Sequence, residues 1–290
     1  MMKNSGESFD YAECADCGSL CLMNPPADMG PYYGAAYYSF GAAWRRAGAL
    51  RRFVKRARDG WQLWGMPQWG GLVAARGRYP ELDSLKRAGI RPDDKVLDIG
   101  CGDGLLVSSL AAWGMEAVGI DPHLEKNELL PSGARLFQRA LPEASGHFDF
   151  VTLNHSLEHM ADPLAALKAA FQASTPQGRC LVRVPTCSSE AWRRFGVHWI
   201  QLDPPRHWTL FSRRGLERLG AEAGWRLKDS FDDSGSFQFW GSLQAQKGIA
   251  LDDARSRRFS PAEMKAFEAE AGDLNRKGEG DSVAMLFVKP

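Results

Sequence analysis

The sequence predicts an α/β fold, a doubly wound parallel sheet with a helical cap on its N-terminal side. Three observations support this prediction: short apolar runs alternate with amphipathic segments after residue 91, a glycine-rich turn follows one of these runs directly, and a lone acid ends the next run. Alternating strands and helices are typical of a parallel sheet covered by helices. At 290 residues, the chain is long enough for one such domain and an appendage.

The first of these elements surround the glycine-rich turn. The apolar run Val96–Ile99 indicates a short buried strand, and the turn at 100–104 leads into an amphipathic helix over 105–113 that ends at Gly114. A second strand, Ala117–Ile120, follows. This order is one strand–helix–strand unit of a parallel sheet.

The later elements continue the alternation. Asp162 and Pro163 predict the N-cap and first residue of a helix, and Ser260 with Glu263 forms the capping-box pattern that opens an inserted helix near 260–272. The other predicted elements are a strand over 180–185, a helix from Ser212 to Gly224, and two last strands over 225–231 and 281–288.

The N-terminal third differs from this pattern, so we divide the chain into three parts: a cysteine-bearing segment and linker at 1–41, a basic helical cap at 42–90, and the α/β domain at 91–290. Cys14 and Cys17 could supply half of a zinc site. Structural zinc takes four ligands, however, and no Cys or His precedes Cys14, while Cys21 lies in an apolar run. We therefore expect this segment to hold no metal.

Composition narrows the classes of partner. The formal net charge is +1, so nothing in the overall balance favours nucleic acid. No apolar run approaches the roughly 20 residues needed to cross a bilayer, and the first residues lack a signal-peptide core. Six unevenly spaced cysteines without an export signal indicate a reducing cytoplasm rather than a disulfide framework.

One segment is strongly basic and aromatic. It contains Arg45, Arg46, Arg51, Arg52, Lys55, Arg56, Arg58, Trp61, Trp64 and Trp69. Such a segment could make peripheral contact with an anionic membrane or with a phosphorylated acceptor. A charge run is more often a solvated helix face, and we expect a cap helix that covers the pocket.

The glycine turn and its flanking acids predict a nucleoside-cofactor site. Gly100, Gly102 and Gly104 let a ligand lie against bare backbone, and Asp121, at the end of the next strand, suits the two hydroxyls of a ribose. The acid before the turn, Asp98, would repel a diphosphate and attract an ammonium or sulfonium group. The pattern thus favours a cationic nucleoside over a dinucleotide.

The wording of this stretch, V-L-D-I-G-C-G-D-G over 96–104, strongly resembles motif I of class I S-adenosylmethionine (SAM) methyltransferases. The stretch 148–163 is similar to the fourth strand and following turn of that family, and 198–212 to a segment of its type 23 branch. Residues 11–18 resemble the branch's N-terminal cysteine knuckle in a degenerate form. The resemblance implies a Rossmann-like sheet of seven strands and SAM as cofactor.

The resemblance also implies which residues bind the cofactor and which act in catalysis. The cofactor residues would be Asp98, Gly100, Cys101, Gly102, Gly104, Asp121, Pro122 and Asn154. His155 and His159 follow Asn154, and His207 lies in a polar, proline-rich loop near the acceptor pocket. A histidine can take the proton that a hydroxyl acceptor must lose. We expect His155 or His159 on the cofactor side and His207 over the acceptor, with the methyl group transferred between them.

Each histidine also has a second interpretation. Glu158 and His159 could organise the turn before the following helix, and His207 could bind the loop backbone. The H-x-x-E-H pattern over 155–159 offers metal ligands as well. Some ubiquinone-pathway and small-RNA methyltransferases use an E-x-x-E-H set for a divalent ion, but His155 replaces the first acid here, so we expect no metal.

The leading hypothesis is a SAM-dependent methyltransferase that methylates an oxygen of a small molecule or of a nucleotide- or lipid-linked sugar. One alternative is a non-catalytic SAM-binding or scaffold protein. Another is an NAD-dependent oxidoreductase, although no second catalytic domain for hydride transfer is evident. Fold and cofactor motif do not identify the acceptor.

Overall fold

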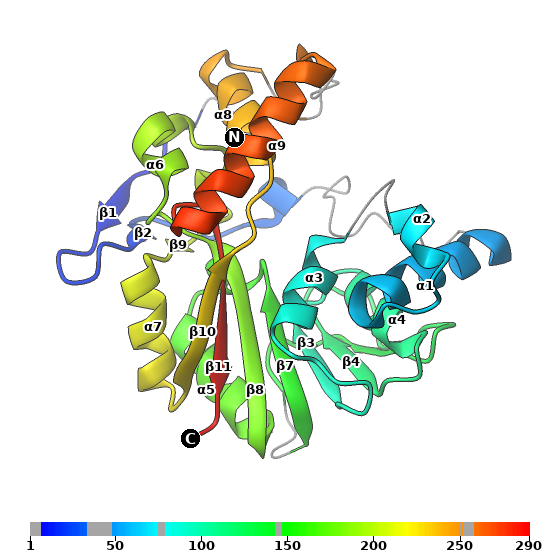
Figure 1. Ribbon diagram of the computed structural model, residues 1–290. Coiled ribbons are helices and arrows are strands. Elements are labelled where there is room, and N and C mark those ends of the chain that lie inside the picture. The colour runs from blue at the N-terminus through cyan, green and yellow to red at the C-terminus, as the bar shows by residue number, and fades with distance from the viewer. Residues whose placement is uncertain (1–6, 34–47, 75–78, 143–146, 250, 252–257) are drawn as a thin grey trace.

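A computed structural model describes residues 7–33, 48–74, 79–142, 147–249, 251 and 258–290 (Figure 1). Its main sheet has eight strands in the order β10-β11-β8-β7-β3-β4-β6-β5. These are β3 (Val96–Ile99), β4 (Ala117–Ile120), β5 (Glu128–Leu129), β6 (Arg135–Phe137), β7 (Phe148–Asn154), β8 (Ser174–Pro185), β10 (Arg226–Asp232) and β11 (Ser282–Val288). The predicted α/β class is confirmed.

The sheet is parallel at its centre and antiparallel at both edges. Strands β6, β4, β3, β7 and β8 run parallel, whereas β11 pairs antiparallel with β8 and β10 with β11. The expected count of seven strands is wrong by one because of β5. This two-residue strand turns back at Pro131–Gly133 and pairs antiparallel with β6, with Leu130 and Ala134 closing the hairpin through a backbone bond of 2.8 Å.

Helices cover both faces of the sheet because successive strand residues point in opposite directions. In β3, Val96 packs against α3 (Pro80–Arg87) and α4 (Leu105–Ala111), and Leu97 packs against α5 (Pro163–Ala173) and α7 (Arg213–Glu222). The expected helix starts at Asp162 and Ser212 are confirmed: each side chain accepts a hydrogen bond from a backbone N–H in the first turn.

A second layer lies over the carboxyl ends of the parallel strands (Figure 1). A small antiparallel sheet joins β1 (Tyr11–Glu13), β2 (Leu20–Leu22) and β9 (Thr209–Leu210). Beside it lie α6 (Glu190–Phe195), α8 (Phe237–Gln246) and α9 (Pro261–Lys277) and the short 3-10 helices η5 (Gly196–His198) and η6 (Ile200–Leu202). The inserted helix begins with the expected capping box at Ser260 and extends five residues further than predicted, to Lys277.

Helix α3 brings Glu81 near Asp98 at this edge, whereas the two helices before it pack against another helix. Helix α1 (Ala49–Trp64), with α2 (Gly70–Ala74), packs beside α4: Trp113 donates its indole N–H to the Arg56 carbonyl at 3.0 Å, and Lys55 donates to the Ser109 hydroxyl. The contacting face of α1 thus meets α4, and the expectation that the basic cap at 42–90 covers the pocket stays a prediction. Residues 42–47 of that predicted segment lie outside the described part. Among the described helices, none is long and apolar enough to span a membrane.

The contact between α1 and α4 depends on Gly60. A Cβ at this position would lie 1.9 Å from the Trp113 ring, whereas a Cβ at Gly272, in the middle of α9, would meet its nearest atom at 3.6 Å. In a helix interior, alanine is more favourable than glycine by about 0.5–1 kcal/mol. We expect Gly272→Ala to raise the unfolding free energy and Gly60→Ala to lower it despite the better helix propensity.

Thermal and urea unfolding of the two variants measure this difference. Stabilisation by both substitutions would show that α1 is not docked on Trp113.

Candidate cofactor and acceptor site

The glycine turn after β3 has a geometry that only glycine satisfies. Gly100, Gly102 and Gly104 all have positive φ angles, of 78°, 53° and 82°. A Cβ on Gly100 would lie 2.3 Å from the Cβ of Ser156, whose hydroxyl donates to the Ile99 carbonyl at 2.7 Å. The turn after β7 thus packs directly against the turn after β3, and the two turns hold each other in place.

Asp121 follows β4 and faces the same turn. Its Oδ2 accepts the Gly102 N–H at 2.9 Å, and its Oδ1 accepts the His123 N–H at 2.9 Å. These two bonds fix the carboxylate, and each oxygen keeps a second lone pair for a ligand hydroxyl. Pro122, beside it, is exposed. The arrangement fits the ribose role predicted for Asp121.

Asp98 is the least satisfied acid in this region. It is 3% exposed, and among the described residues its Oδ1 has no hydrogen-bond partner. Burial, then the charges of Asp121 and Glu81, raise the pKa of its carboxyl to about 8. Glu81, from α3, also has a buried oxygen, Oε2, without a partner in the described part. Two unpartnered acceptors beside a glycine turn suit the cationic methionine end of SAM and oppose a diphosphate.

Cys101 forms part of the wall of this turn. A Cβ on Gly119 would lie 2.6 Å from its sulfur, so the thiol packs against the bare backbone of β4. Burial, with the nearby Asp98 and Asp121 carboxylates, raises its pKa well above the usual value, and the thiol stays protonated.

Asn154 ends β7 and is held by Arg183 of β8. Its Oδ1 accepts from Arg183 Nη1 at 2.9 Å, and the same guanidinium pairs with Asp233 and, at 3.5 Å, with Glu81 Oε1. Burial opposes the charge, but Asp233 and Glu81 keep the pKa of Arg183 above its usual value. Sequence reasoning missed Arg183 and Glu81. The signal was the single arginine in the middle of the buried Cys180–Pro185 run.

His155 comes next and has strained backbone. Its φ of 48° is unusual for a residue with a side chain, and such strain is often found at functional sites. The side chain is 28% exposed, and Nδ1 lies 3.5 Å from Glu158 Oε1. Burial alone would raise the pKa of Glu158, but His155, His159 and His207 lower it to about 2. Glu158 is therefore ionised and faces His155.

His159 and His207 contact each other. Their ring centroids lie 4.7 Å apart in an edge-to-face arrangement. Each Nδ1 bonds a backbone carbonyl, that of Arg206 at 2.9 Å for His159 and that of Gln201 at 2.6 Å for His207. Burial and the neighbouring His207 lower the pKa of His159 to about 4, so it is neutral at pH 7. The contact leaves no space for an acceptor between these two rings, and the catalytic roles expected for the three histidines stay predictions.

Glu158, in the 3-10 helix η4 (Leu157–His159), also forms a donor cluster with the two histidines. One ligand atom from each of Glu158, His159 and His207 lies within 4.8 Å of the others, a set that could hold a metal ion. Both Glu158 carboxylate oxygens are buried without a hydrogen bond in the described part. The predicted absence of a metal here stays a prediction, as it does for Cys14 and Cys17, which no third donor joins within the described residues.

Tyr33, at the end of the 3-10 helix η1 (Gly30–Tyr33), connects the two sides of the site. Its ring stacks on His123 with centroids 5.5 Å apart, and its hydroxyl lies 3.2 Å from His159 Nδ1. The tyrosine therefore bridges the loop after β4, which carries Asp121, and the histidine cluster. Sequence reasoning did not identify Tyr33 as part of the site.

The fold and site together define an α/β protein that binds a cationic nucleoside at the carboxyl edge of a parallel sheet. A family model for a methyltransferase domain, type 23, matches residues 74–229. Because this match covers more than half of the chain, the protein belongs to that family, whose cofactor is S-adenosylmethionine. The cysteine-bearing segment lies outside the matched residues.

Individual relatives are more distant. Ubiquinone biosynthesis O-methyltransferases of Yersinia pestis and Yersinia pseudotuberculosis are each 29% identical over 119 residues, which are 37% of this chain and 49% of theirs. The chain thus spans about half the length of the curated relatives it matches. A SAM-dependent methyltransferase structure from Mesorhizobium loti aligns over 73% of this chain and 98% of its own at 14% identity, with a TM-score of 0.49. One from Archaeoglobus fulgidus aligns over 76% and 99% at 20% identity, with a TM-score of 0.44.

The raised pKa of Asp98 gives a test of the site without any acceptor. A folded-state pKa of about 8, above the ordinary 3.8, means that stability is greatest below pH 3.8 and is lost as the pH rises toward 8. Asp98→Asn removes the titrating group. We expect its Tm to exceed that of the natural protein at pH 8 by ~2 °C or more, the shift that about 1 kcal/mol causes in a chain of this size.

The same substitution should weaken SAM binding, because the ammonium group of SAM would favour the ionised Asp98 carboxylate and Asn cannot supply that charge. Differential scanning calorimetry from pH 5 to 8, with calorimetric titration of SAM, measures both effects. The Tm difference should shrink toward pH 5, where the natural carboxyl is protonated. A lower Tm for the variant at pH 8 would contradict the assignment of Asp98 as an unpaired buried acid.

Proposed function

We propose that the protein transfers the methyl group of SAM to a hydroxyl oxygen of its acceptor. The observation that carries the cofactor half of this proposal is the pair of unpartnered carboxylate oxygens on Asp98 and Glu81 beside the glycine turn. They would hold the methionine ammonium group while Asp121 binds the ribose, with the glycine turn, Cys101, Pro122 and Asn154 as the surrounding wall. When bound, SAM supplies a methyl group on an electrophilic sulfonium.

We assign proton removal to His155. It lies at the carboxyl end of β7, next to Asn154, and its side chain is 28% exposed, whereas His207 is buried. Ionised Glu158 would orient its ring and stabilise the imidazolium that forms when the hydroxyl proton is taken. His159 and His207 would have a structural role. Their Nδ1 atoms bond backbone carbonyls of the loop over 201–207, and these bonds would hold that loop next to Glu158. The Trp208 N–H fixes that loop by donating to the Glu158 carbonyl at 2.8 Å.

The proposed acceptor is a small molecule or a nucleotide- or lipid-linked sugar with a free hydroxyl. The name of the Yersinia relatives, which are O-methyltransferases, supports oxygen as the methylated atom. The six cysteines are all free in the structure, which supports action in a reducing compartment such as the cytoplasm.

Two alternatives make different predictions. An NAD-dependent enzyme would need to accommodate a diphosphate beside Asp98 and Glu81, which electrostatics opposes. A non-catalytic SAM-binding scaffold would bind the cofactor and transfer nothing. Transfer of labelled methyl from SAM to any component of a small-molecule extract distinguishes an enzyme from such a scaffold.

Replacing Asp121 with Ala tests the cofactor site. The substitution removes a charged acceptor of ribose hydrogen bonds, a loss of about 1.5–3 kcal/mol, so SAM affinity should fall at least about tenfold. Calorimetric titration measures this, with Asp273→Ala as the matched control because that carboxylate is 59% exposed on α9. Equal SAM affinity in the two variants, or binding of NAD instead of SAM by the natural protein, would reject the site.

Replacing His155 with Ala tests the base. Loss of a general base costs about 10²–10⁴-fold in rate, and SAM affinity should be retained. Glu158→Gln should reduce turnover less, because it removes only the orienting charge. The control is His147→Ala, whose side chain is 51% exposed and lies just before β7.

A metal ion bound by Glu158, His159 and His207 is the alternative to His155 as the group that activates the hydroxyl. We expect turnover to persist in EDTA because the proposed base is an imidazole. Loss of activity in EDTA that Mg²⁺ or Zn²⁺ restores, together with normal turnover of His155→Ala, would transfer the role to a cation held by Glu158, His159 and His207.

A further inference from the structure

An exposed apolar patch lies on α1, α2 and the turn between them. The part of the chain that the structure describes has nine exposed large apolar side chains, and five of them lie here: Leu50 (77% exposed), Phe53 (60%), Met66 (63%), Trp69 (41%) and Leu72 (75%). The rings of Phe53 and Trp69 stack with centroids 5.4 Å apart, so α1 and the turn before α2 meet within the patch. Clustered exposure of this kind marks a contact surface rather than scattered surface residues.

Uncompensated positive charge accompanies this patch. Arg51, Arg52 and Arg56 are exposed on α1, and within the described residues none of them forms an ion pair. Lys55 and Arg58, on the same helix, both pair with the buried Asp59. Asp59 thus neutralises two cations of the helix, Arg56 lies over the Trp113 ring at 5.1 Å from its centroid, and Arg51 and Arg52 form no ion pair within the described residues.

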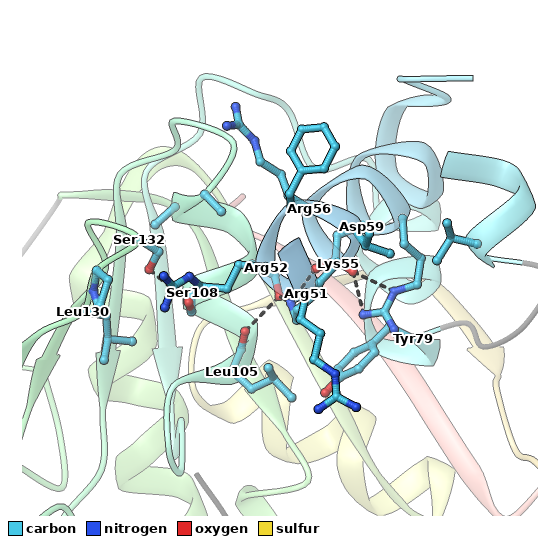
Figure 2. Close-up of a pocket in the computed structure, with 18 of the residues that line it drawn as sticks. Arg51, Arg52, Lys55, Arg56, Asp59, Tyr79, Leu105, Ser108, Leu130 and Ser132 are labelled. Carbon is cyan, nitrogen blue, oxygen red and sulfur yellow. Dashed lines mark hydrogen bonds and ion pairs between the residues drawn. The ribbon is translucent and has the colours of Figure 1, made fainter. Parts of the chain in front are cut away.

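A cavity of about 1060 Å³ opens next to the patch, between α1, α4 and the hairpin turn after β5 (Figure 2). Phe53 lines it, so the cavity and the apolar patch are continuous. Figure 2 shows the Arg52 side chain reaching toward Ser108 and Ser132, whose hydroxyl oxygens lie 3.0 Å apart. Arginine and hydroxyl donors around one space suit the oxygens of a phosphate group.

We propose that α1 and α2 dock the protein on an anionic lipid bilayer, with the phosphate of a lipid headgroup in the cavity of Arg51, Arg52, Ser108 and Ser132. Leu50, Phe53, Trp69 and Leu72 enter the interfacial layer, where tryptophan and basic residues are favoured. Charge alone would suit a nucleic acid equally well. The exposed aliphatic side chains Leu50, Met66 and Leu72 would gain nothing from contact with a nucleic acid backbone, whereas a bilayer would bury them. They therefore favour a bilayer as the partner.

This surface is separate from the cofactor site but close to it along the chain. Leu105, which lines the cavity, directly follows Gly104 of the glycine turn. Docking through α1 therefore holds the cofactor domain at the membrane while the layer over the histidines stays clear of α1. The inference does not depend on methyl transfer, so each can fail without the other.

Co-sedimentation of the full chain with vesicles tests the proposal. We expect binding to vesicles of phosphatidylcholine with 30% phosphatidylglycerol and little binding to phosphatidylcholine alone. One basic residue near an anionic surface contributes roughly fivefold in partitioning, so Arg51→Glu with Arg52→Glu should weaken binding by about 25-fold or more. Leu50→Ser with Leu72→Ser should also weaken it, since both side chains are more than 70% exposed and their loss leaves the fold intact.

Matched controls separate this surface from general charge and apolarity. Arg91→Glu with Arg226→Glu changes two exposed arginines at the other end of the sheet's strands, and Met23→Ser with Val197→Ser changes two exposed apolar residues elsewhere. Both controls should bind vesicles normally, and all four variants should keep the natural SAM affinity by calorimetry.

Three results would overturn the proposal. The first is equal binding to neutral and anionic vesicles. The second is binding that the charge reversal abolishes and the leucine substitutions leave unchanged, which would indicate a soluble phosphate compound. The third is tighter binding to a single-stranded oligonucleotide than to anionic vesicles, with the same dependence on Arg51 and Arg52.

Discussion

Three carboxylates, those of Asp98, Asp121 and Glu81, meet at the edge of the sheet where the glycine turn begins, and the site is organised around their repulsion. Asp121 is stabilised by two backbone N–H groups, whereas Asp98 and Glu81 each keep a buried oxygen without a hydrogen bond in the described part. Burying anions in this way costs stability unless a cation arrives. Arg183 supplies one positive charge from β8, directed at Glu81, Asn154 and Asp233. The remaining need for positive charge favours a cationic ligand at this edge.

The turn that carries the acidic residues packs directly against the turn that carries His155. Gly100 has no side chain because Ser156 occupies that space, and Ser156 is bonded back to the end of β3. The chain between Asn154 and Ser156 must therefore change direction within one residue, and His155 takes the left-handed conformation that this requires. The close packing of these two turns thus accounts for the strained backbone of His155. This packing fixes the backbone at His155, which the proposed general-base role of that residue would need.

Local patterns in the sequence predicted most strands of the sheet but few of the contacts between elements that are distant in sequence. Strands β3, β4 and β11 and the capped helices α5, α7 and α9 follow from apolar periodicity and from cap residues, which act within a few positions of each other. The glycine turn, Asp98 and Asp121 were predictable for the same reason. Glu81, Arg183 and Tyr33 were not, because each reaches the site from an element distant in sequence. Strand β5 is two residues long, too short for any period, and α1 has a basic, partly apolar surface that gives no indication of which helix it packs against.

The residues that reach the site from outside the matched family region are concentrated on one side of it. Tyr33 contacts His159 and His123, and the Tyr11 hydroxyl donates to the His207 carbonyl at 2.7 Å. Ser212 Oγ in turn donates to the Cys17 carbonyl, which fixes this N-terminal segment to α7. Most of these contacts lie on the histidine side, although the Tyr33–His123 stack also reaches the loop of Asp121. The acidic side is otherwise built by residues within 74–229 and by Asp233 just beyond them. The division is physically reasonable: the cofactor imposes one fixed arrangement of charge on the common domain, and under the proposed function the N-terminal segment would contact the acceptor side of the site.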